Sequence, residues 1–292
     1  MIFEGISFEV FKFYFAVLLL CHFLGDFYIQ TKKMAKSKED DYKNTFVHSI
    51  LYTIPSVAAF LIGAVYFWNV VSLKSLVLIL VAVSVAHLVV DLIKCNRIKT
   101  YKKVYKNTYE LPSNPGKIIN ADRKTNLFIA DQACHILLLA FIALAVGGSK
   151  TFIDAWSILS AGQAQMIYLA LLTAFLLVPA SIIFQILFKR YQPSEILGKM
   201  NETDMENGTE ENKEIKENIK GAGEIIGYME RILMAIFFCL GQYTAVGFII
   251  AAKSIARYDK ISKKGAFAEY YLIGTLYSVL VTLLAFVLLW SP

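Results

Sequence analysis

The chain contains few charged residues, few histidines and few cysteines. Of its 292 residues, 18% are Asp, Glu, Lys or Arg, four are His and four are Cys. In soluble domains about a quarter of all residues are charged, so this composition excludes an ordinary soluble enzyme. Low charge combined with high apolar content also excludes a disordered chain. Four cysteines, all in or beside apolar sequence, do not indicate a disulfide-stapled secreted domain.

Apolar residues make up 57% of the chain, and its mean hydropathy is +0.54. They are concentrated in seven blocks of about 20 residues, the length at which a helix crosses a bilayer. The blocks are residues 8–29, 46–68, 73–93, 127–146, 165–188, 232–252 and 270–290. The sequence therefore predicts an all-α, polytopic membrane helical bundle of about seven hydrophobic helices, with six or seven crossings.

Lysine and arginine in the connecting segments predict the orientation. Basic residues follow the first and third blocks, which places those connections in the cytoplasm and the N-terminus outside. The sixth block is ambiguous, because Lys189 and Arg190 precede it and Lys253 and Arg257 follow it. It either crosses against the charge bias or forms a re-entrant hairpin broken near Gly241 and Gln242. Its length favours a crossing, and hence seven crossings in total.

The apolar blocks and the polar stretches between them divide the chain into four predicted segments. Residues 1–147 form a four-helix membrane domain, and residues 148–191 contain a fifth membrane helix with its flanks. Residues 192–222 are acidic and too polar to fold by burial, which indicates a cytoplasmic linker, with EENKEIKENIK as a candidate helix within it. Residues 223–292 supply the C-terminal membrane helices.

The four histidines lie in the first four blocks, and three of them have an aspartate four residues away. That spacing places both side chains on one face of a helix. At about 1.5 Å per residue, each pair lies roughly 8 to 13 Å below the cytoplasmic interface. Four antiparallel helices can therefore bring seven ligands into one layer, which are His22, Asp26, His48, His87, Asp91, Asp131 and His135.

Imidazole and carboxylate groups favour a divalent transition metal, zinc first and manganese or iron as alternatives, over calcium. One catalytic zinc needs three protein ligands, so seven candidates leave room for one or two ions. Some carboxylates can instead act as general base, which makes Asp26, Asp91 and Asp131 catalytic candidates. The alternative for each pair taken alone is a hydrogen-bonded residue of the helix interior. Ionisable groups in lipid are costly and are by default functional.

Three further residues are candidates for substrate binding. Lys94 continues the helix face of His87 and Asp91 towards the membrane surface, where it suits a phosphate group. Positive charge near anionic lipid is the alternative explanation for the loop that follows. Glu230 and Arg231 stand at the cytoplasmic end of the sixth block. They either contact a substrate anion or form a structural ion pair at a helix end.

Several motifs resemble a bacterial inner-membrane family known as the domain of unknown function 3307. The N-terminal motifs are HFLGDFYIQ from His22, the isolated His48, HLVVDLIK from His87 and DQACH from Asp131. The C-terminal half, with GEIIGYMERIL, GQYTAVGFIIAAKSIAR and AEYYLIGTLYS, looks like the end of longer members. The resemblance implies that the protein lies in a prokaryotic cytoplasmic membrane. The family name does not indicate an activity. The H-x-x-x-D pairs are more weakly similar to membrane-bound metal-dependent hydrolases, and by analogy to ceramidase-like enzymes.

Three functions remain open at this stage. The first is an intramembrane metal-dependent hydrolase that acts at the cytoplasmic leaflet on a lipid ester, amide or phosphoester through metal-activated water. The second is a metal-ion or proton transporter or channel, although transporter sites usually lie near the midplane between repeated halves. The third is a non-enzymatic membrane partner with a structural metal. Membrane lipid is the expected partner, and no nucleic acid is expected.

Overall fold

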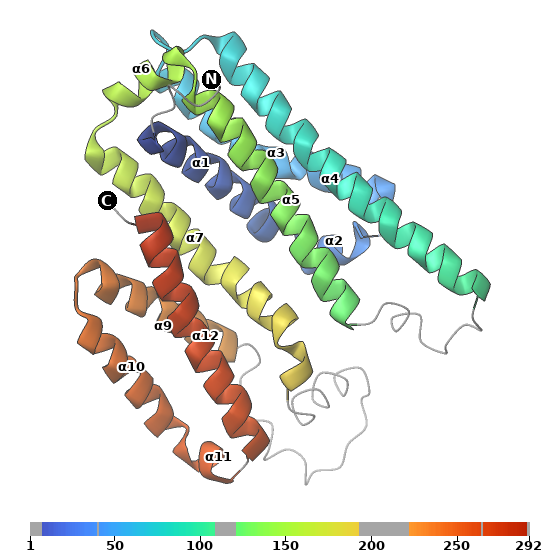
Figure 1. Cartoon of the computed structure of the whole chain (residues 1–292), viewed down its shortest axis with the longest axis vertical. Helices are drawn as coiled ribbons and strands as arrows, with labels where there is room; N and C mark the ends of the chain where they lie inside the picture. The colour runs from blue at the N-terminus through green and yellow to red at the C-terminus, as the bar shows by residue number, and fades with distance from the viewer. Residues whose placement is uncertain (1–7, 40, 109–120, 193–221, 264, 291–292) are drawn as a thin grey trace. The chain divides into compact units, whose positions relative to one another are not determined.

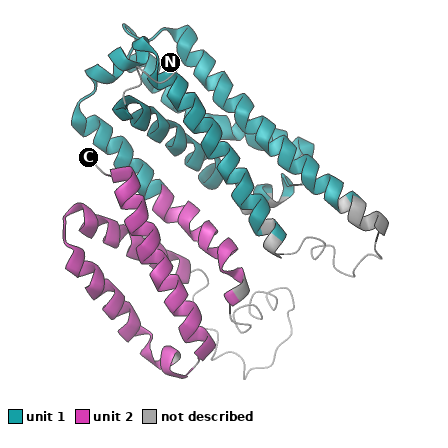
Figure 2. Ribbon diagram, in the orientation of Figure 1, with its two compact units in different colours: residues 1–174 teal, residues 175–292 magenta. Residues whose placement is uncertain are grey.

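A computed structural model describes residues 8–39, 41–108, 121–192, 222–263 and 265–290. These residues are almost entirely helical and contain no strand. Six of their helices are long and apolar enough to cross a membrane, which makes the chain a multi-pass membrane protein. It divides into two compact units, residues 1–174 and 175–292 (Figure 2). The boundary falls inside one helix, α7 (Ala161–Leu187). The linker predicted at 192–222, with its candidate helix, falls almost entirely outside the described residues.

The first unit is built on four long helices that pack in a closed ring. They are α1 (Phe8–Phe23), α3 (Tyr42–Tyr66), α4 (Leu73–Thr108) and α5 (Ala121–Gly147). Contacts join α1 to α3, α3 to α4, α4 to α5 and α5 to α1, and Figure 1 shows α1 and α5 running side by side. A short helix that the sequence analysis did not predict, α6 (Lys150–Ile158), packs Phe152 and Ala155 against Val71 and Val146. The four long helices of this unit lie within residues 1–147, while the unit itself extends to residue 174.

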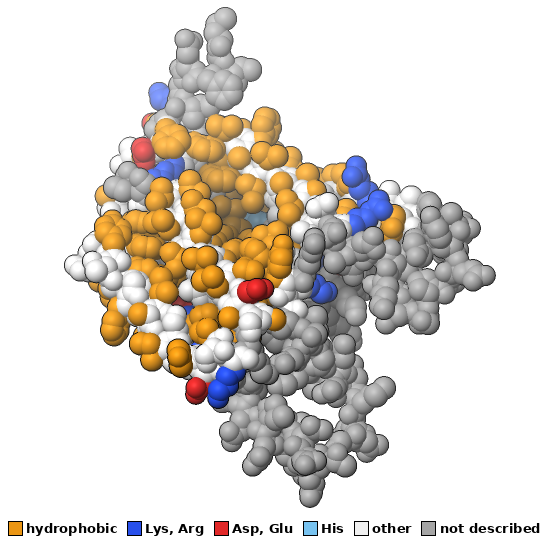
Figure 3. Space-filling model, turned by 60° about the horizontal axis from the view of Figure 1, so that its bottom comes forward, with side chains coloured by type: hydrophobic (Ala, Val, Ile, Leu, Met, Phe, Trp, Pro, Cys, Tyr) orange, Lys and Arg blue, Asp and Glu red, His pale blue; other side chains and the backbone are white. Residues whose placement is uncertain are grey.

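Polarity in this unit is reversed relative to a soluble protein. Large apolar side chains face outwards, for example Ile62, Val65, Leu78 and Phe141, each at least 69% exposed. Figure 3, which draws both units, shows one face of the molecule on which hydrophobic side chains predominate and charged ones are few. The interior instead contains histidine, aspartate and lysine side chains. Such an exterior suits lipid, because apolar surface of this extent is unfavourable in water.

The connection between α1 and α3 is short and folds back over the ends of these helices. The last turn of α1 widens into a π-helix, η1 (Leu24–Ile29), and the chain then forms α2 (Lys32–Ser37). Gly25 allows η1 to lie against α3, because a Cβ atom there would lie 2.9 Å from the backbone oxygen of Tyr52. Thr31 and Asp41 cap α2 and α3 by accepting hydrogen bonds from backbone N–H groups.

The second unit contains the end of α7 and the helices that follow the linker. These are α9 (Ala222–Cys239), α10 (Tyr243–Ala256), α11 (Tyr258–Lys263) and α12 (Gly265–Trp290). α9 packs against α12 and α10, and Met234, Phe238 and Val246 form their shared core. A tight turn joins α9 to α10, and Gly241 adopts φ +69°, which side chains with a Cβ rarely adopt.

This turn corrects one prediction. Residues 232–252 do not form one helix across the membrane, because the chain reverses at Gly241 inside that block. The single spanning helix preferred for residues 232–252 is therefore wrong, and the chain breaks at Gly241, where the hairpin alternative placed the break. Each of the remaining six blocks matches a helical segment long enough to span, and no block extends more than two residues beyond it. α4 continues beyond its block to Thr108.

Candidate metal centre

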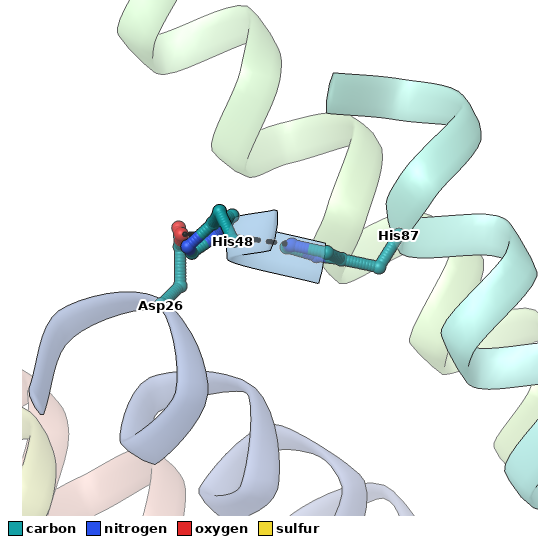
Figure 4. Close-up of side chains that lie close together, drawn as sticks. All are labelled: Asp26, His48 and His87. Atoms are coloured by element: carbon teal, nitrogen blue, oxygen red, sulfur yellow. Dashed lines mark hydrogen bonds and ion pairs between the residues drawn. The ribbon is translucent and has the colours of Figure 1, made fainter. Parts of the chain in front are cut away.

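All seven predicted ligands are buried in the first unit. Asp26 comes from η1, His22 from α1, His48 from α3, and the remaining four from α4 and α5. Each of the seven residues is at most 6% exposed, and His22 and His48 are 0% exposed. Figure 4 shows Asp26, His48 and His87 pointing towards one another from three different elements. The convergence predicted from the helical spacing is therefore present.

The first group of ligands is Asp26, His48 and His87. The Oδ1 atom of Asp26 lies 3.1 Å from Nε2 of His48, which in turn lies 3.3 Å from Nε2 of His87. A lysine is also present in this group. The ammonium of Lys38, just after α2, donates to Oδ1 of Asp26 at 2.7 Å and to Nε2 of His48 at 2.8 Å. It also reaches Oδ2 of Asp91 at 3.5 Å.

The second group is His87, Asp91 and His135. Nδ1 of His135 lies 2.9 Å from the backbone oxygen of Asp131. Because a carbonyl only accepts, Nδ1 carries the proton and the lone pair is on Nε2. Among the residues that the structure describes, that Nε2 has no hydrogen-bond partner, and neither has Oδ1 of Asp91, which lies 4.0 Å away. Nδ1 of His87 is also without a partner. Buried polar atoms are rarely left unpaired, so this group offers ligand atoms that none of the described residues satisfies.

Two predicted ligands have partners within the protein and lie beside these groups. His22 has its Nδ1 3.3 Å from the hydroxyl of Tyr52 and its Nε2 3.3 Å from Oε1 of Gln132. Asp131 accepts a hydrogen bond from Lys94 at 2.8 Å through Oδ2, while its Oδ1 has no partner. Both residues are thus at the cluster but outside the two groups whose atoms lie close enough together to share one ion.

Of the predicted substrate-binding residues, Lys94 lies in the first unit beside the cluster. Its ammonium pairs with Asp131, and its side chain is 16% exposed. Glu230 and Arg231 belong to the second unit, and each has partners there. Glu230 accepts a hydrogen bond from Lys253 at 2.7 Å. Arg231 donates to the backbone oxygens of Leu176 and Leu177, in the turn before Pro179 of α7. Glu230 thus forms an ion pair with Lys253 and Arg231 is held by α7, although both residues lie within α9 and not at a helix end.

Lys38, Tyr52 and Gln132 belong to the cluster and were not predicted. Lys38 is one of several lysines in the connection after the first block, and charge alone does not distinguish it. Tyr52 follows His48 by four residues and therefore shares its helix face, which is a signal that the sequence offers. Its ring stacks on His87 with centroids 3.4 Å apart. Gln132 joins Asp26 to His22 through its amide.

Burial and charge act in opposite directions on Lys38. Burial alone would lower its pKa, but the carboxylates of Asp26 and Asp91 outweigh that effect and hold the pKa above the ordinary value of 10.5. Lys38 is therefore an ammonium ion at neutral pH. Its backbone is also anchored, because its N–H donates to Met34 and its carbonyl accepts from the Thr45 hydroxyl at 2.8 Å.

A small cavity adjoins the second group. Its volume is about 10 Å³, which is about enough for one water molecule. His87, His135 and Tyr52 line it together with Val83, Ala86, Leu138 and Leu139. Leu138 is 37% exposed, so the cavity lies close to the outer surface along α4 and α5. The ligands thus meet a water-sized space whose other walls are largely apolar.

These features define a multi-pass α-helical membrane protein with a buried histidine, aspartate and lysine cluster. The family model described as "Protein of unknown function (DUF3307)" matches residues 14–162, and the chain belongs to that family. The matched segment runs from α1 to the first residues of α7 and includes every residue of the cluster. No curated protein and no solved structure matches the chain. The family supports the first resemblance, whereas nothing supports the likeness to metal-dependent hydrolases.

Proposed function

We propose that the cluster binds a divalent transition metal, zinc first, and that the protein is an intramembrane metal-dependent hydrolase. The observation that carries the proposal is the set of buried ligand atoms without partners on His87, Asp91 and His135. The hydrogen bond from His135 Nδ1 to a backbone carbonyl adds support, because metal-bound histidines usually donate their other N–H in this way. A mixed imidazole and carboxylate donor set suits zinc, manganese or iron.

Hydrolysis joins the oxygen of one water molecule to a carbonyl carbon or phosphorus. The bond to the leaving oxygen or nitrogen breaks, and the leaving group takes a proton. A bound divalent metal lowers the pKa of water and polarises the substrate oxygen. Among the three candidate bases, Asp131 has a free Oδ1 and lies outside both ligand groups. We therefore assign Asp131 the transfer of the proton from water to the leaving group, with Lys94 holding its other oxygen.

The cavity supports a lipid substrate. It gives the second group space for one water, and it lies near the lipid-facing side of α4 and α5. An ester, amide or phosphoester bond of a lipid could approach the cluster from that side without passing through water. A site near the headgroups suits such a bond better than the bilayer midplane does.

We propose the inner membrane of a prokaryote from the family resemblance, and the hairpin supports one orientation in it. If α9 and α10 return to the side from which they started, the basic residues before α9 and after α10 lie on one side, as the charge bias requires. The N-terminus is then outside and the cluster is near the cytoplasmic face.

Metal analysis tests the proposal. Wild-type protein purified in detergent should contain a transition metal, and His87→Ala should lose it, since His87 belongs to both ligand groups. Asp154→Ala, in α6 and outside the cluster, serves as the matched control and should retain the metal. Wild-type protein with no more metal than His87→Ala would refute the proposal.

Activity then distinguishes the hydrolase from its rivals. We expect the metal-loaded protein to hydrolyse an ester, amide or phosphoester bond in a panel of lipids, and Asp131→Asn to lose this activity while it keeps the metal. Metal-dependent ion flux in proteoliposomes without hydrolysis would instead indicate a transporter. Bound metal with neither flux nor hydrolysis would indicate a structural site.

A further inference from the structure

We propose that Lys38 takes the place of a second metal ion, so that the cluster binds one divalent metal, at His87, Asp91 and His135, beside a fixed ammonium. This inference rests on the proposed metal site and determines its stoichiometry, which the seven ligands leave open. It starts from the position of the Lys38 ammonium, within 2.8 Å of two of the ligand residues in the first group.

Lys38 already uses the ligand atoms that an ion in the first group would need. An ammonium donates hydrogen bonds and accepts none, so Nε2 of His48 must present its lone pair to Lys38 at 2.8 Å. Oδ1 of Asp26 accepts from the same ammonium at 2.7 Å. A metal at this position would have to displace Lys38 from both. The lysine is 7% exposed, and its backbone is held by Met34 and Thr45.

The second group retains its ligand atoms. Nε2 of His135 and Oδ1 of Asp91 have no partner and lie 4.0 Å apart. Two ligand atoms on one tetrahedral zinc are about 3.3 Å apart, given bonds of about 2.0 to 2.1 Å. A movement of less than 1 Å, about the difference between these two separations, would bring the atoms to that distance. The two groups therefore have different occupants. The first group holds the ammonium of Lys38, and the second group is available to the metal.

The charge of the cluster favours the same partition. Asp26 and Asp91 bring two negative charges and Lys38 one positive charge, while Asp131 is paired separately with Lys94. One divalent metal changes the net charge from minus one to plus one, and a bound hydroxide would then neutralise it. With two divalent metals and Lys38 in place, the net charge of the cluster would be plus three before hydroxide binds. Uncompensated charge in a buried site is costly, so the ammonium and one metal are the better match.

Zinc stoichiometry tests this inference. Detergent-solubilised protein is dialysed against buffered zinc chloride, and bound zinc is measured by mass spectrometry. We expect one equivalent for wild type and for Lys38→Arg, which keeps the charge. We expect two equivalents for Lys38→Met, which frees Asp26 and His48. Lys43→Met, an exposed lysine five residues away, is the matched control and should bind one.

The possible results separate the two proposals. Two equivalents in wild type, or one in a folded Lys38→Met, would overturn the role of Lys38 and leave the metal site intact. No zinc in wild type would overturn both. Lys38→Gln provides a second uncharged variant, and circular dichroism with size-exclusion chromatography establishes which variants fold. A cobalt titration of wild type that ends at one equivalent supports the inference without any variant, and an end point at two refutes it.

Discussion

The chemistry of Lys38 is set by its surroundings. A lysine this well buried would ordinarily lose its proton more easily, but two carboxylates raise its pKa instead. Because the folded-state pKa is raised, the stability from this charge is complete below the unfolded-state pKa. It is lost only as the pH rises through the higher folded-state value. The charge therefore supports the fold throughout neutral and mildly alkaline conditions.

The reactivity of Lys38 follows from its charge and burial. At pH 8 we expect an amine-acylating reagent to modify Lys38 more slowly than the exposed Lys43 and Lys103, since a raised pKa lowers the fraction of free amine and burial limits access of the reagent. Peptide mass spectrometry after brief labelling measures this. Labelling in denaturant should remove the difference, and equal rates in the folded protein would contradict the described position of Lys38.

At the residue scale, the sequence predicted the histidines and aspartates and missed the lysine. The pairs at four-residue spacing follow from helix geometry alone, because a helix fixes which side chains share a face. Lys38 reaches the cluster only because α2 folds back over the ends of α1 and α3. That path depends on tertiary packing, and no local pattern separates Lys38 from neighbouring lysines.

At the scale of the helix, Gly25 controls how η1 meets α3. An added Cβ would lie 2.7 Å from a ring carbon of Tyr52 and 2.9 Å from its backbone oxygen. We expect Gly25→Ala to destabilise the protein by about 1 to 3 kcal/mol, as overpacking usually does, and to weaken metal binding by moving Asp26 and Tyr52. Thermal unfolding in detergent measures the first effect.

A second glycine provides the control. Gly247 lies within α10 and has open space around its Cβ position. Gly247→Ala should therefore stabilise its helix by about 0.5 to 1 kcal/mol, because alanine is the better helix former. If both substitutions had the same effect, the close approach at Gly25 would not be the cause.

The hairpin of α9 and α10 makes a prediction about topology. α10 has 14 residues, about 21 Å at 1.5 Å per residue, which is shorter than the hydrocarbon core of about 30 Å. Reporters fused after Gln192 and after Lys263 should lie on the same side, and a reporter after Val71 on the opposite side. Paired reporters that are each active on one side measure this. If the first two reporters lay on opposite sides, residues 232–252 would have to cross the membrane.

The sequence offered this break near Gly241 only as an alternative, and it could not decide between the break and a crossing. Six blocks are uniform runs of apolar residues, and length alone identifies them. Around Gly241 the residues on both sides are apolar, so hydropathy averages over the turn. The conformation of one glycine decides between a crossing and a hairpin, and hydropathy does not report it.

For the whole molecule, metal binding should appear as stability. A ligand that binds only the folded state stabilises it by about 2.7 kcal/mol when its free concentration is 100 times Kd. We expect zinc to raise the unfolding temperature of wild type and leave those of His87→Ala and His135→Ala unchanged. Calcium should have no effect, given the imidazole ligands. A zinc effect of equal size in these variants would place the metal elsewhere.

The parallel stacking of Tyr52 on His87 provides a natural spectroscopic probe. The two rings are 3.4 Å apart at their centroids and inclined by 2°, so the imidazole protons of His87 lie in the shielding region of the phenol ring. In an NMR spectrum they should resonate furthest upfield among the four histidines, since His22 and His48 meet Tyr52 at wider separations and steeper angles. The same resonances would respond directly to any ion that His87 binds.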